Sequence, residues 1–168
     1  MAVKHYKNIQ AVGEDGTTIA MQMTDAINQG LRRRGVQIFI FNESGQILLQ
    51  KRGAQVMQPN LLEQSAGGHV DEGETYYQAA VRELEEELNL SGYSLEEITT
   101  EFKTDDFVNG VYKLVVTDDI SITVDPEEVT GATWYDLDTL AKELKLNLEK
   151  FNPDFVETWS ALHDKLTT

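Results

Sequence analysis

The sequence contains no cysteine, and proline occurs only three times among its 168 residues. A chain without cysteine forms no disulfide, uses no thiolate nucleophile and builds no zinc site from sulfur. No apolar run approaches the roughly 18 residues of a membrane-spanning helix, and the amino-terminal residues lack the apolar core of a signal peptide. These absences predict a cytoplasmic protein with no membrane partner.

Basic residues are also scarce. Lysine and arginine total 14 against 29 aspartates and glutamates, which gives a formal net charge of −15. Binding of nucleic acid requires clustered basic side chains, so this balance predicts no nucleic-acid partner, and it is compatible with a site for divalent cations. The length and the 40% share of apolar residues predict one domain over residues 1–168 with a buried core.

Turn residues between apolar runs predict two β-hairpins. In an amino-terminal extension over residues 1–35, the runs 7–12 and 17–23 flank a turn at residues 14–16. In the second hairpin, strands at 36–41 and 46–50 flank the turn-forming residues 42–45. Further strands are predicted at 111–116, 120–124 and 132–135.

Helical signals are fewer than strand signals. Apolar residues at spacings of four, three and four predict an amphipathic helix over residues 76–88. Thr24 is a candidate N-cap for one or two helical turns, and Asp136 is one for a helix over 137–144. Asn152 and Pro153 predict the start of a carboxy-terminal helix over 153–166. Such a mixture predicts an α/β (α+β) fold or an α/β/α sandwich.

The stretch 67–90, GGHVDEGETYYQAAVRELEEELNL, carries the chemistry. Glu83, Glu86 and Glu87 are three and four residues apart, so they share one face of the predicted helix, with Arg82 as the local counter-charge. Hard cations such as Mg²⁺ prefer carboxylate and carbonyl oxygens, which this face and the preceding glycines can supply. An isolated E-x-x-E-E pattern is more often a solvated helix face, so the spacing of the whole stretch decides between the two interpretations.

That full spacing resembles the Nudix box, G-x5-E-x7-R-E-U-x-E-E-x-G-U, in which U is a large aliphatic residue. The residues in its fixed places are Gly68, Glu74, Arg82, Glu83, Leu84, Glu86, Glu87 and Leu90. Asn89 stands where the pattern has its last glycine. This place would follow the helix in a left-handed conformation, which Asn tolerates better than other side chains do.

The flanks resemble the same family. Residues 47–52 are similar to its strand before the box, and residues 127–128 and 134–137 to its late acidic loop, strand and helix. The resemblance implies a Nudix-type α/β/α sandwich with a mixed sheet, and a Mg²⁺- or Mn²⁺-dependent pyrophosphohydrolase. Its substrate would be a nucleoside diphosphate linked to another group, cleaved at the phosphoanhydride by a metal-activated water. A homodimer is common in the family.

Carried over to this sequence, the resemblance implies that Glu83, Glu86 and Glu87 ligate the metal, with the Gly67 carbonyl beside them. Glu74 would support this cluster and Arg82 would orient the carboxylates. The general base would be Glu83 or an acid on a later loop. The candidates on the later loops are Glu127, Glu128, Asp105 and Asp106.

Three other residues are candidate contacts for the substrate. Arg52 and Lys51 lie at the end of a predicted strand, where an arginine can grip two phosphate oxygens. His69 follows the glycines and is a candidate ligand or phosphate contact. A plain surface role is the competing interpretation for each. The basic run 32–34 is more typical of a solvated surface.

Two alternatives to a hydrolase stay open. The stretch SAGGHV also resembles the isopentenyl-diphosphate isomerases that share the Nudix fold. That family has a catalytic cysteine about where Gly67 stands and a Glu-x-Glu pair where this chain has Asn109 to Tyr112. The other alternative is a non-catalytic Nudix-fold binding module, which would be expected to have lost glutamates of the box. The sequence does not distinguish nucleoside triphosphates, nucleotide sugars, dinucleotide cofactors and ADP-ribose as substrates.

Overall fold

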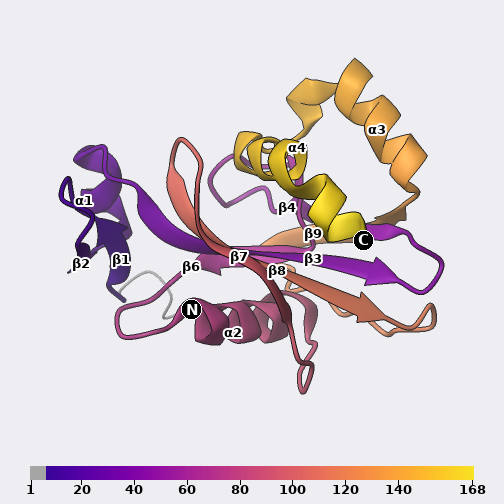
Figure 1. Cartoon of the computed structure of the whole chain (residues 1–168), viewed down its shortest axis with the longest axis horizontal. Coiled ribbons are helices and arrows are strands. Elements are labelled where there is room, and N and C mark those ends of the chain that lie inside the picture. The colour runs from indigo at the N-terminus through magenta and orange to yellow at the C-terminus, as the bar shows by residue number, and fades with distance from the viewer. Residues whose placement is uncertain (1–6) are drawn as a thin grey trace.

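The computed structural model describes residues 7–168 (Figure 1). Its strands are β1 (Ile9–Val12), β2 (Thr18–Met21), β3 (Arg33–Asn42), β4 (Ile47–Arg52), β5 (Leu62–Glu63), β6 (Ala66–His69), β7 (Glu96–Lys103), β8 (Phe107–Val116) and β9 (Val129–Tyr135). Its helices are α1 (Met23–Asn28), α2 (Tyr76–Leu88), α3 (Leu137–Leu146), the 3₁₀ turn η2 (Leu148–Lys150) and α4 (Pro153–Thr167). None of the helices in this described part is long and apolar enough to cross a membrane.

The sheet is mixed and is organised around β3. This strand pairs in parallel with β8 over its whole length and antiparallel with β6. It meets β4 only at Phe41, opposite Ile47, and β4 then pairs with β5 and β9. The two strands of the predicted second hairpin therefore diverge from their turn, and the sheet is divided between β3 and β4.

Alternate residues of β3 supply two hydrophobic cores on opposite faces of the sheet. Ile38 and Ile40 belong to a cluster with Leu84 of α2. Phe39 belongs to the other cluster, with Phe155 of α4. Figure 1 shows α2 on one side of the sheet and α3 and α4 on the other, so the predicted α/β/α sandwich is confirmed.

An amino-terminal extension of β1, β2 and α1 lies at one end of the molecule, coloured indigo in Figure 1. β1 and β2 pair antiparallel, as the first predicted hairpin requires. One residue pair, Ala11 opposite Arg33, joins β1 to β3. Ile9, Ala11 and Ala26 form a third, small hydrophobic cluster. The extension therefore has a core of its own.

Two local predictions are wrong. Residues 120–124 form no strand, because Ile120, Ile122 and Val124 pack onto the core beside α2 while the Thr123 N–H donates to the Leu88 carbonyl. This segment is bound to the end of a helix and not to a strand edge. Thr24 does not cap α1, which already includes it and has Gln22 at the N-cap position.

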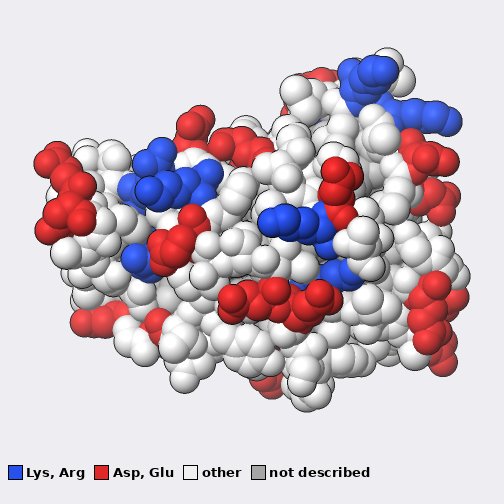
Figure 2. Space-filling view, in the orientation of Figure 1, with Lys and Arg blue, Asp and Glu red and all other residues white. Residues whose placement is uncertain are grey.

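The charge of the surface agrees with the composition. On the face drawn in Figure 2, the basic side chains of the described residues form separate groups with acidic side chains beside them. Acidic side chains also occupy both ends of this view. This face therefore offers no continuous basic surface for a nucleic acid.

Candidate active site

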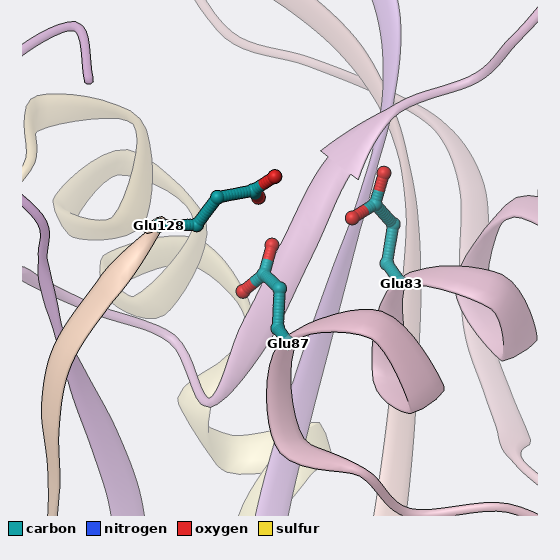
Figure 3. A group of neighbouring side chains, drawn as sticks. All are labelled: Glu83, Glu87 and Glu128. Atoms are coloured by element: carbon teal, nitrogen blue, oxygen red, sulfur yellow. The ribbon is translucent and has the colours of Figure 1, made fainter. Parts of the chain in front are cut away.

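Three carboxylates from two parts of the chain converge beside the sheet (Figure 3). Glu83 and Glu87 come from α2, and Glu128 comes from the loop directly before β9. One oxygen from each lies within 4.8 Å of the others, and Glu83 and Glu87 are each only 4% exposed. Like charges at this separation repel strongly when buried, so the arrangement fits a bound cation.

α2 is fixed at both ends by local sequence. Thr75 forms a capping box with Gln78, in which each side chain bonds the other residue's backbone N–H. Asn89 ends the helix in the predicted left-handed conformation, with φ 54° and ψ 37°. Between these caps, Leu84 and Leu88 face the core and Glu83 faces Gly68 of β6.

Gly68 is required beside Glu83. A Cβ atom on Gly68 would overlap the carboxylate of Glu83. The absence of a side chain at Gly68 therefore leaves the space that the Glu83 carboxylate occupies. The packing of α2 against β6 requires a glycine at this position.

Arg82 joins the carboxylates of the box. Its Nε donates to Oε1 of Glu74 at 2.7 Å, and its Nη2 donates to Oε2 of Glu74 and to the His69 carbonyl, both at 2.9 Å. Its Nη1 donates to Glu83 at 2.7 Å and to Glu86 at 3.2 Å. The predicted orienting role of Arg82 and supporting role of Glu74 fit these contacts. Glu86 lies beside Arg82 and outside the group of three carboxylates.

The loop that carries Glu128 is held by backbone hydrogen bonds to the end of α2 and to the residue that follows β4. The Asp125 N–H donates to the Glu87 carbonyl at the end of α2, and the Gly53 N–H donates to the Glu128 carbonyl at 2.8 Å. The other acids proposed as a base, Glu127, Asp105 and Asp106, are exposed and lie outside the group.

Glu87 supplies the clearest electrostatic sign of a cation site. Burial raises the pKa of its carboxyl well above the usual value, and the charges of Glu83, Glu63 and Glu128 raise it further. Its Oε2 atom is buried and has no hydrogen-bond partner among the described residues. An acceptor oxygen in this state matches the carboxylate ligands that Mg²⁺ and Mn²⁺ take.

Glu63 is a nearby acid that belongs to no motif in the sequence. It is 2% exposed and accepts hydrogen bonds from Arg52 at 2.8 Å, from Gln50 at 2.9 Å and from Asn152 at 2.7 Å. Arg52 also donates to the Met57 carbonyl, so its guanidinium is held in place. Lys51 is exposed. No spacing in the sequence connects Glu63 with Asn152, because 89 residues separate them.

His69 is half-buried, and its surroundings favour the neutral ring. Burial and the positive charges of Arg33, Arg52 and Arg82 lower the pKa of its ring to about 3. The ring lies 3.4 Å from Nη1 of Arg33, whose guanidinium stacks on Phe107. Arg33, in the middle of the basic run, is thus buried, contrary to the expectation of a solvated surface.

Another acid, which is half-buried, lies at the start of α4. Asp154 accepts hydrogen bonds from Gln37 at 2.6 Å, from Asn109 at 3.3 Å and from the Thr104 hydroxyl. Burial raises its pKa to about 6. Its place one residue after Pro153 predicts only a helix start, so no pattern in the sequence indicates this network.

Gly67 leaves no room for a side chain. A Cβ atom there would lie 2.6 Å from the Val36 carbonyl oxygen and 2.8 Å from the amide nitrogen of Gln64. The first neighbour is backbone in a paired strand and cannot easily move. Any side chain at this position would require the strands to shift.

Comparisons with known proteins place these features in context. Residues 31–158 match the family model described as the NUDIX domain. An isopentenyl-diphosphate Delta-isomerase of Cereibacter sphaeroides is 30% identical over 149 residues, which cover 83% of each chain. A Nudix hydrolase of Yersinia pestis is 28% identical over 156 residues, which cover 90% of this chain and 83% of that protein. A crystal structure of a Deinococcus radiodurans protein is similar with a TM-score of 0.77 and 28% identity, over 90% of this chain and 96% of that one.

Proposed function

This chain belongs to the Nudix hydrolase family, and from that premise we propose that it is a divalent-metal-dependent pyrophosphohydrolase. Its substrate class is a nucleoside diphosphate linked to another group, and the bond cleaved is the phosphoanhydride. The observation that supports this proposal most strongly is the buried group of Glu83, Glu87 and Glu128, with its unpartnered Glu87 oxygen.

The metal-holding residues of the proposal are Glu83, Glu87 and Glu128, together with the Gly67 carbonyl and Glu86 as the family resemblance implies. A divalent cation bound there supplies charge neutralisation of phosphate oxygens and lowers the pKa of a coordinated water. Mg²⁺ and Mn²⁺ both suit a site of carboxylates and a carbonyl.

The remaining roles belong to side chains of the protein. Arg82, anchored on both oxygens of Glu74, keeps the Glu83 carboxylate in one orientation. Glu83 and Glu128 are the two candidates for the base that takes the proton of the attacking water. Arg52, held by Glu63, is the candidate grip on a substrate phosphate, with Lys51 beside it. His69 is neutral and can contribute a hydrogen bond, but it carries no charge.

The relatives named as isomerases suggest the second candidate function. Two observations support the hydrolase over it. The chain has no cysteine, and Gly67, where the isomerases would have their catalytic cysteine, has a backbone oxygen 2.6 Å from the place of a Cβ atom. Asn109 also stands in the stretch where the isomerases have a Glu-x-Glu pair, and it donates to Asp154. A proton donor and acceptor for chemistry at carbon are therefore not available in those places.

A substrate screen tests the proposal. Nucleotide sugars, dinucleotide cofactors, ADP-ribose, nucleoside triphosphates and isopentenyl diphosphate are each incubated with Mg²⁺ or Mn²⁺, and products are separated by anion-exchange chromatography. We expect cleavage of a nucleotide to a nucleoside monophosphate, abolished by EDTA. Glu83→Gln should lower kcat by about 10²–10⁴-fold with little change in KM. Conversion of isopentenyl diphosphate to its isomer, with every nucleotide left intact, would show the proposal to be wrong.

A further inference from the structure

The amino-terminal extension touches the loop that begins the Nudix box. This extension precedes residue 31, where the match to the NUDIX domain begins, and it has its own hydrophobic cluster. Its strand β1 lies against residues 70–74, which connect β6 to α2. The loop includes Glu74, the residue that holds Arg82.

Gln10 makes the main contacts between β1 and this loop. Its Nε2 donates to the Asp71 carbonyl at 2.9 Å and to the Glu74 carbonyl at 2.8 Å, so both amide hydrogens are used. Its backbone N–H donates to the Val70 carbonyl at 2.9 Å. A single residue of the extension thus bonds to three carbonyls at the two ends of the loop.

The residues beside Gln10 extend the contact. The Asn8 carbonyl accepts from the Glu72 N–H at 2.9 Å, and the Asn8 side chain donates to the Glu72 carboxylate at 3.1 Å. Ile9 forms an isolated β-bridge with Asp71. Because Glu72 and Gly73 at the tip of the loop are exposed, apolar burial contributes little to the conformation of the tip, and these hydrogen bonds help to set it.

The loop leads directly to the carboxylates. The Asp71 N–H donates to Oε2 of Glu74 at 2.9 Å, and both oxygens of Glu74 accept from Arg82. Arg82 in turn donates to Glu83 at 2.7 Å. The path from Gln10 to Glu83 therefore consists of consecutive hydrogen bonds.

We propose that Gln10 is a positioning residue, through which the extension fixes the Glu74–Arg82 pair and thereby the orientation of Glu83. The proposal rests on the proposed function, because it concerns the same metal-holding carboxylates. Outer contacts of this kind commonly change metal affinity by about 10–100-fold when they are removed. The extension is thus part of the active site's framework although it precedes the matched domain.

Substitutions at Gln10 in the full chain test this role. Gln10→Leu removes both side-chain hydrogen bonds at similar volume, whereas Gln10→Lys keeps a donor for the two carbonyls. Gln29→Leu is the matched control, because Gln29 lies in the same extension with an exposed side chain. Mn²⁺ affinity is measured by calorimetry, and hydrogen exchange of the Arg82 Nε–H is measured by NMR without metal. Thermal unfolding of each variant reports its stability.

We expect Gln10→Leu to weaken Mn²⁺ binding by about 10-fold and to speed exchange of the Arg82 Nε–H. Gln10→Lys should recover most of both losses, and Gln29→Leu should match the wild type. An unchanged Arg82 signal in folded Gln10→Leu would overturn the proposal, as would a loss of affinity that Gln10→Lys does not recover. If the wild type itself binds no Mn²⁺, the metal-dependent function fails, and the Arg82 signal still decides whether Gln10 positions the pair.

Discussion

Gly68 and Glu83 show how a missing side chain on one element makes room for a carboxylate on another. The glycine lies on β6 and the glutamate on α2, and a Cβ atom on Gly68 would overlap the carboxylate. The box pattern in the sequence records this pairing as a fixed spacing of 15 residues. Its physical reason becomes visible only when strand and helix are packed.

Gly68→Ala should therefore displace the Glu83 carboxylate. We expect kcat to fall by at least about 10²-fold, since a shift of about 1 Å in a catalytic group can cost that much. Gly131→Ala is the matched control, because a Cβ atom on that strand glycine meets no atom within 4 Å. Steady-state kinetics of the two folded variants makes the comparison. Equal activity in both would mean that Glu83 does not need its present place.

Asp154 should give the stability of the protein a dependence on pH. Its raised pKa, about 6, means that the folded state binds the proton more tightly than the unfolded state does. Stability contributed by the protonated form is therefore lost as pH rises from about 4 to about 6. Asp154→Asn removes this titration. The unfolding free energy of the variant, relative to that of the wild type, should therefore rise by about 1–3 kcal/mol between pH 4 and pH 7.

Urea unfolding of wild type and Asp154→Asn at several pH values measures this difference. The other titrating groups are common to both proteins and largely cancel. A difference that stays constant from pH 4 to pH 7 would show that the Asp154 carboxyl has an ordinary pKa in the folded protein.

Helix α2 is the part of the fold that the sequence predicts best. Its bounds, Tyr76–Leu88, and its left-handed end at Asn89 are those expected from the apolar period and the box. Both signals are local, because a helix is set by residues three and four apart and by its caps. Residues 120–124 are also apolar in alternation, but they bind the end of α2, and no local pattern reveals such a partner.

The residues of the candidate site are likewise predictable only where the signal is local in sequence. Glu83, Glu87 and Arg82 lie within one recognisable spacing, and Glu128 is identified only as one of several later acids. Glu63 and Asp154 accept hydrogen bonds from residues distant in sequence, so only the folded chain brings these partners together. Gln10 has no signal of its own, since its partners are backbone carbonyls.

The end of α2 offers a direct test of its capping. Asn89→Gly should be neutral or stabilising by up to about 1 kcal/mol, because glycine adopts positive φ without a Cβ penalty. Asn89→Val should cost about 1–2 kcal/mol, because a β-branched residue is strained there. Denaturant unfolding measures both free energies. A harmless Asn89→Val would contradict the left-handed end of this helix.

Across the protein, the divided sheet brings the parts of the site together. β6 carries Gly67 and Gly68, β4 and β5 carry Arg52 and Glu63, and α2 and the loop before β9 carry the three carboxylates. The carboxylates of Glu63 and Asp154 tie the start of α4 to strands of both halves of the divided sheet. The fold thus brings an acidic centre and a fixed arginine together, as the proposed attack on a phosphorus atom requires.

Isotope incorporation distinguishes these two chemistries most directly. The nucleotide that the substrate screen identifies is turned over with Mg²⁺ in ¹⁸O-labelled water, and isopentenyl diphosphate is incubated in parallel in deuterated water. We predict one ¹⁸O atom on a phosphate oxygen of one nucleotide product and no deuterium on carbon. Deuterium on the carbon chain of isopentenyl diphosphate, without ¹⁸O in any phosphate product, would contradict hydrolysis at phosphorus.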